Sequence, residues 1–101
     1  MSDNKIVVSV DADLEELIPG FLENRIKDVQ SLREALAEQD VGKIQSIGHS
    51  LKGVGGGYGF DALSEIGAAI EAAAKQQDLG SIEALIVSMA DYLERIDIVF
   101  E

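Results

Sequence analysis

The chain has 101 residues, with 19 acidic and 8 basic side chains, a formal net charge of −11, one histidine and no cysteine. This length predicts one domain over residues 1–101 and excludes a complete kinase, which would need a nucleotide-binding domain as well. The acidic charge argues against a nucleic-acid partner, because binding to phosphates by counterion release needs a basic face. The lack of cysteine excludes thiol catalysis and cysteine-based zinc sites.

The sequence carries no signal for export or membrane insertion. Residues 1–5 lack the basic start of a signal peptide, and the apolar run 6–10 is too short for one. No stretch approaches the length of a membrane span. We therefore expect a cytoplasmic protein without a membrane partner, and the start at Met1 with no linker at either end favours a small free-standing one.

The first long helix is predicted from apolar residues that recur at spacings of three and four between positions 14 and 36. It should start near Asp11 or Asp13, which can cap it, and end at about Glu38. Pro19 interrupts the pattern. Two forms remain open: a short opening turn followed by the main helix, or one helix kinked at the proline.

Three further helices follow, over residues 44–58, roughly 61–77 and roughly 79–97, each with apolar residues at helical spacing. The corners at 39–44 and 77–82 resemble each other, since each has an aspartate suited to N-capping before an apolar run. Similar corners indicate two antiparallel helical hairpins. The predicted fold is therefore all-α, an antiparallel up-down-up-down four-helix bundle with the N-terminal segment packed against it.

The single histidine, His49, lies on the second predicted helix. At about 100° per residue, the apolar residues of this helix form one stripe, and His49 lies opposite that stripe and faces solvent. Its neighbours at helical spacing are Gln45, Lys52, Gly53 and Gly56. The imidazole should therefore have a cation beside it and open space in front of it. Gln45 either hydrogen-bonds the ring or is an ordinary solvated side chain.

The charge pattern around His49 differs from that of the rest of the chain. No acidic residue occurs from Val41 to Phe60, where the charged residues are Lys43 and Lys52. We expect an anion brought to His49 to meet the least repulsive part of the surface. The same stretch offers no carboxylates for magnesium, and one histidine without cysteine supplies too few ligands for zinc, so no metal site is expected.

Glycines are concentrated in residues 53–59. This run is not a P-loop, because no Lys-Ser/Thr pair follows its last glycine and no strand precedes it. On the helical wheel, Gly48 and Gly55 lie beside the apolar stripe and should let a neighbouring helix approach closely. Gly57 and Gly59 should end the helix and turn the chain.

The run His49-Ser50-Leu51-Lys52-Gly53, followed six residues later by Gly59, resembles the H-x-L-K-G-x(5)-G motif of histidine-containing phosphotransfer (HPt) domains. The likeness covers essentially the whole chain and implies a four-helix bundle with the motif on its second helix. It also implies that His49 is the phosphoacceptor, that Lys52 lies close to the phosphoryl group and that Gly53 clears the surface for the partner. We expect Gln45, Gly53 and Gly56 to form the partner-docking surface.

The resemblance implies a phosphoryl carrier of a two-component phosphorelay, working between receiver-domain aspartates or between a sensor kinase and a response regulator. A neutral imidazole nitrogen is a competent nucleophile near pH 7. A receiver domain would supply the aspartate and the magnesium, so the chain needs no cofactor of its own. We expect a monomer without autonomous kinase activity.

Two alternatives to a phosphoryl carrier can be set beside it. One is a non-catalytic helical adaptor that docks a receiver or another protein without being phosphorylated, which keeps the fold and loses the need for His49. The other is a hydrolase that uses Ser50 with His49, and it is poor because adjacent helical positions point about 100° apart.

Overall fold

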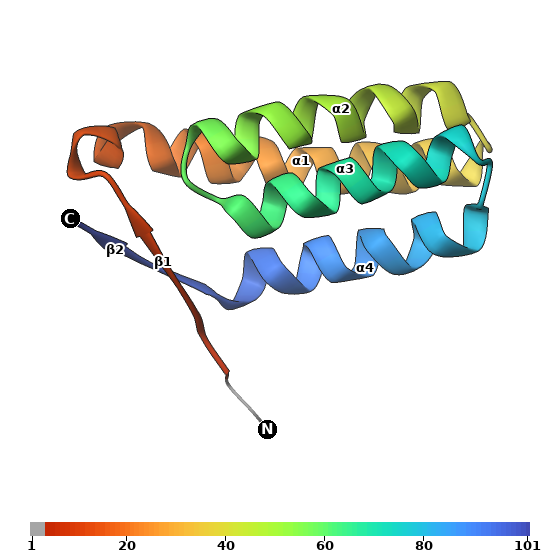
Figure 1. Ribbon diagram of the computed structural model, residues 1–101. Coiled ribbons are helices and arrows are strands. Elements are labelled where there is room, and N and C mark those ends of the chain that lie inside the picture. Colours follow the sequence, from red (N-terminus) through yellow and green to blue (C-terminus); the bar gives the residue numbers. More distant parts are fainter. Residues whose placement is uncertain (1–3) are drawn as a thin grey trace.

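The computed structural model describes residues 4–101 (Figure 1). Its elements are strand β1 (Ile6–Val10), the 3-10 helix η1 (Ala12–Leu17), helices α1 (Ile18–Ala37), α2 (Val41–Gly57), α3 (Asp61–Lys75) and α4 (Leu79–Arg95), and strand β2 (Ile96–Phe100). The predicted four-helix bundle is confirmed. In Figure 1 the α1–α2 and α3–α4 corners lie at one end and the α2–α3 corner at the other, so successive helices run in opposite directions. None of the helices within residues 4–101 is long and apolar enough to cross a membrane.

The first of the two predicted forms is observed: a short helix, η1, precedes the main helix α1. The side chain of Asp11 accepts a hydrogen bond from the backbone N–H of Asp13 and so caps η1. Pro19 lies in the first turn of α1. Proline is tolerated there because the N–H groups of a first turn have no partner inside the helix. The proline therefore marks where η1 gives way to α1, and it does not kink a longer helix.

The two similar corners have the same structure. The side chain of Asp40 caps α2 by accepting a hydrogen bond of 3.1 Å from the backbone N–H of Lys43. The side chain of Asp78 caps α4 in the same way, with a bond of 3.1 Å from the backbone N–H of Ser81. Gln39 and Gln77 both adopt a φ of 56°, which turns the chain between helices. The left-handed conformation of Gln77 also explains why α3 ends at Lys75, earlier than predicted.

The C-terminal end differs from the prediction. Helix α4 ends at Arg95, and residues 96–100, which begin within the predicted helix, form β2. This strand pairs in parallel with β1, from Ile6 opposite Ile96 to Val10 opposite Phe100. Along β2, half-buried and exposed side chains alternate, as expected for a strand with one face on the bundle. The two ends of the chain thus form a small sheet beside the helices (Figure 1).

Three aromatic rings hold the α2–α3 corner against α1. The ring of Phe21 stacks on Tyr58 and on Phe60, with centroids 4.4 and 5.0 Å apart, and Phe60 is fully buried. Such pairs stabilise a core beyond the area that they bury. They fix the glycine-rich end of α2 relative to the rest of the bundle.

Candidate functional site

The structure places His49 on the solvent-facing side of α2. Its side chain is 69% exposed, and that of Lys52, one turn further along, is 49% exposed. Both side chains are therefore open to a partner that approaches α2.

The core-facing side of α2 is wider than the predicted apolar stripe. Its fully buried residues are Ile44, Gly48, Leu51 and Gly55. Ile47 and Val54 are half-buried and also pack against the core. Gly48 and Gly55 therefore extend the buried contact around the helix toward the side of His49.

Glycines make this wider contact possible, because they let α2 and α3 touch backbone to backbone. A Cβ atom on Gly48 would lie 2.7 Å from the backbone nitrogen of Glu71, and one on Gly55 would lie 2.7 Å from that of Ser64. The predicted close approach at Gly48 and Gly55 is confirmed. On α3 the matching glycine is Gly67, whose added Cβ would lie 2.6 Å from the backbone nitrogen of Lys52. Gly67 was not among the residues predicted from the sequence.

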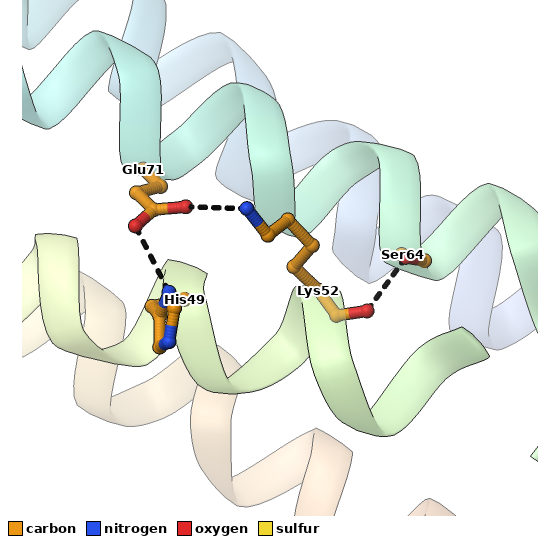
Figure 2. Close-up of polar contacts among 4 residues, drawn as sticks. All are labelled: His49, Lys52, Ser64 and Glu71. Atoms are coloured by element: carbon orange, nitrogen blue, oxygen red, sulfur yellow. Dashed lines mark hydrogen bonds and ion pairs between the residues drawn. The ribbon is translucent and has the colours of Figure 1, made fainter. Parts of the chain in front are cut away.

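This close packing brings a carboxylate to the histidine (Figure 2). Oε2 of Glu71 lies 3.0 Å from Nδ1 of His49, and Oε1 lies 3.4 Å from Nζ of Lys52. The side chain of Glu71 is only 13% exposed. The expectation that an anion at His49 would meet the least repulsive surface is wrong in this respect. The stretch from Val41 to Phe60 lacks acids in sequence, but α3 supplies one in space.

Glu71 is held in its ionised form. Partial burial by itself raises the pKa of this carboxyl, but the hydrogen bonds and charges of His49 and Lys52 together outweigh burial and hold the pKa below its ordinary value of 4.5. An ionised carboxylate can only accept hydrogen bonds. In the neutral imidazole, Nδ1 must therefore carry the proton and Nε2 the lone pair. Figure 2 shows Nε2 on the side of the ring that faces away from Glu71.

The other predicted site residues fall into two groups. Gln45 is half-buried on α2, and it is Glu71, not Gln45, that accepts the hydrogen bond from the ring. Gly53 and Gly56 lie on the open side of α2. No atom of residues 4–101 comes within 4 Å of a Cβ added at Gly53, apart from its own helix backbone and chain neighbours, and only the hydroxyl of Ser64, at 3.8 Å, does so at Gly56.

The glycines at the end of α2 are used as predicted. Gly57 is the last residue of the helix, and Gly59 adopts a φ of 88°, which turns the chain toward α3. Within residues 4–101 no group of three or more His, Cys, Asp or Glu side chains is placed to hold a metal ion.

Ser64 is a third residue, after Gly67 and Glu71, that was not predicted from the sequence. Its hydroxyl, on α3, donates a hydrogen bond of 2.6 Å to the backbone carbonyl of Lys52 (Figure 2). The site thus consists of three side chains, His49, Lys52 and Glu71, and the Ser64 hydroxyl of α3 binds the backbone carbonyl of Lys52.

Comparison with protein families gives one match, the Hpt domain, over residues 16–98. This range includes all of α1, α2, α3 and α4 together with His49 and Lys52. Neither the curated proteins nor the solved structures gave a significant match.

Proposed function

The chain belongs to the Hpt domain family, whose role is phosphotransfer in two-component signalling, and from this we propose that it carries a phosphoryl group on His49. Its partners would be receiver domains of response regulators or hybrid sensor kinases. The observation that carries the proposal is the hydrogen bond between Nδ1 of His49 and Glu71. It supports a ring with its nucleophilic nitrogen, Nε2, exposed to a partner.

The transfer step can be written on this geometry. The lone pair of Nε2 attacks the phosphorus of an aspartyl phosphate on the receiver, the P–O bond to the aspartate breaks, and the aspartate leaves as a carboxylate. The proton on Nδ1 stays in place, so the ring becomes positively charged as the N–P bond forms. Glu71, 3.0 Å from Nδ1, stabilises this charge. The reverse reaction passes the group to the next receiver.

Lys52 supplies the positive charge for the phosphoryl oxygens. Phosphoryl transfer depends mostly on positioning and on neutralising the charge of the equatorial oxygens. In the resting site the Lys52 ammonium lies 3.4 Å from Glu71, and its half-exposed side chain is free to turn toward a group on Nε2. Magnesium would arrive with the receiver, because the carboxylate beside His49 is already paired with His49 and Lys52.

The surface beside His49 supports docking of a receiver. Gly53 and Gly56 have no side chains, so they leave open space on the α2 face where a partner must approach the imidazole. Gln45, on the same helix, would form the other side of this contact. We propose these three residues as the partner-docking surface.

The test is to incubate the protein with a phosphorylated receiver and to follow label on this chain. Phosphohistidine should give acid-labile, alkali-stable label on the wild type and none on His49→Gln. An adaptor that only docks would bind the receiver equally well in both forms and carry no label in either. That result would replace the carrier function with the adaptor function.

A further inference from the structure

Ser64 makes the contact between α3 and the backbone of the site. Its hydroxyl donates a 2.6 Å hydrogen bond to the carbonyl of Lys52, which lies within the normal range for an O–H···O bond. Lys52 belongs to α2, so this bond joins the two helices directly behind a proposed site residue. Ser64 lies outside the motif around His49.

The bond lies where α2 has the least helical preference of its own. The five residues after Lys52 are Gly53, Val54, Gly55, Gly56 and Gly57. Glycine favours a helix less than any residue except proline, so this end of α2 depends on contacts from outside the helix. The Ser64 bond attaches to the last carbonyl before that glycine-rich segment.

Close packing of the two backbones accompanies this bond. A Cβ added at Gly55 would lie 2.7 Å from the backbone nitrogen of Ser64, so the two backbones meet at that level without side chains between them. The α2 backbone is therefore held to α3 in two ways, by direct backbone contact at Gly55 and by the Ser64 hydrogen bond at Lys52.

We propose that Ser64 is a positioning residue for phosphoryl transfer, which acts through Lys52. By holding the Lys52 carbonyl, it fixes the point from which the ammonium reaches Glu71 in the resting site and the phosphoryl group during transfer. Positioning errors of about 1 Å at a reacting group lower rates strongly. This inference rests on the proposed function, because it assigns Ser64 a part in the same transfer.

A double-mutant cycle tests the proposal. The rate of transfer from a phosphorylated receiver is measured in a single turnover for the wild type, Ser64→Ala, Lys52→Ala and the double variant. Ser64→Ala should slow transfer by about fivefold, the rate equivalent of one neutral hydrogen bond. In the Lys52→Ala background the same change should have no further effect, because the group that Ser64 positions is gone.

Two outcomes of the cycle would overturn the proposal. One is a Ser64→Ala variant that transfers as fast as the wild type. The other is an equal slowing by Ser64→Ala with and without Lys52, since a general structural defect would act in both backgrounds. Ser88→Ala, on the exposed side of α4, is the matched control and should leave the rate unchanged.

A second measurement needs no partner. Amide hydrogen exchange of residues 53–57, followed by NMR, should be several-fold faster in Ser64→Ala than in the wild type, because the segment loses its tie to α3. Unchanged exchange would contradict the proposal whatever the transfer rates are. If the wild type is not phosphorylated by a receiver but exchange is faster in Ser64→Ala, the carrier function is refuted. The Ser64 hydrogen bond would then still be shown to stabilise the end of α2.

Discussion

Oε2 of Glu71 lies 3.0 Å from Nδ1 of His49, although the two residues are 22 positions apart in sequence. The contact depends on α2 and α3 approaching so closely that neither Gly48 nor Gly67 has room for a side chain. It orients the imidazole, determines which nitrogen carries the proton, and leaves the other nitrogen exposed. The glycines of the helix interface and the chemistry of the histidine are thus parts of one arrangement.

The ionisation of Glu71 predicts a pH-dependent contribution to stability. Its folded pKa lies below the ordinary value of 4.5, so the unfolded chain takes up the proton first as the pH falls. The stabilisation from Glu71 should be complete above about pH 4.5 and should be lost as the pH falls through the lower, folded pKa. Denaturant unfolding of the wild type and Glu71→Gln from pH 7 to pH 3 measures this as the difference in unfolding free energy.

Taking the difference removes contributions that both proteins share, such as that of Asp78, whose pKa is also lowered by its hydrogen bonds to Ser81. Glu65→Gln, at an exposed glutamate of the same helix, is the matched control. A difference between wild type and Glu71→Gln that stays constant down to pH 3 would show that the carboxylate gains nothing from its two neighbours.

Lys52→Ala should slow transfer to His49 by about tenfold to a hundredfold, the scale of losing one electrostatic contact to the transferring group. The effect should be largest at low salt, because the ammonium is half-exposed and therefore screened. Lys43→Ala removes the same charge from an exposed position of the same helix and should transfer nearly as fast as the wild type. Equal rates for all three proteins at low salt would leave Lys52 as ordinary surface charge.

Gly53 should respond in opposite directions for stability and for transfer. Nothing within 4 Å obstructs a side chain there among the described residues beyond its own helix, so Gly53→Ala should raise the unfolding free energy by roughly 0.5–1 kcal/mol. Gly53→Gln should block the receiver and slow transfer while the fold stays intact. Thermal melts and transfer rates check both. A Gln variant that transfers like the wild type would mean that the docking surface lies elsewhere.

Substitution of Gly67 by alanine should lower the stability of the fold, in contrast to the same substitution at Gly53. An added Cβ would lie 2.6 Å from the backbone nitrogen of Lys52 and 2.8 Å from the carbonyl of Gly48, and backbone atoms cannot rotate away as a side-chain end can. Overpacking costs about 1–3 kcal/mol, which exceeds the gain of about 1 kcal/mol in helix propensity. Gly67→Ala should therefore lower the denaturant midpoint and move Glu71 away from His49. A variant more stable than the wild type would contradict the close contact.

Local features of the structure could be predicted from the sequence. The helices follow from apolar spacing, and the caps at Asp40 and Asp78 follow from residue type, because both depend on neighbours within a few positions. The close approach at Gly48 and Gly55 could also be predicted, since a glycine beside an apolar stripe has few other uses.

Features that depend on distant segments could not be predicted in this way. Glu71 reaches His49 only because α2 and α3 approach backbone to backbone at Gly48 and Gly67. Gly67, one turn before Glu71, carried a usable signal: pairing it with Gly48 would have brought the next turn of α3 to the histidine. The pattern predicts residues 96 and 97 as the end of α4, because apolar residues continue there and the strand's partner β1 is at the opposite end of the chain.

The exposed Nε2 of His49 is the central claim, and NMR of the phosphorylated protein tests it most directly. With ¹⁵N-labelled histidine and a phosphorylated receiver as donor, the ring spectrum should show the phosphoryl group on Nε2 and the proton retained on Nδ1, because Glu71 occupies the Nδ1 side at 3.0 Å. A phosphoryl group on Nδ1, on a residue other than His49, or on no residue of this chain would contradict the account.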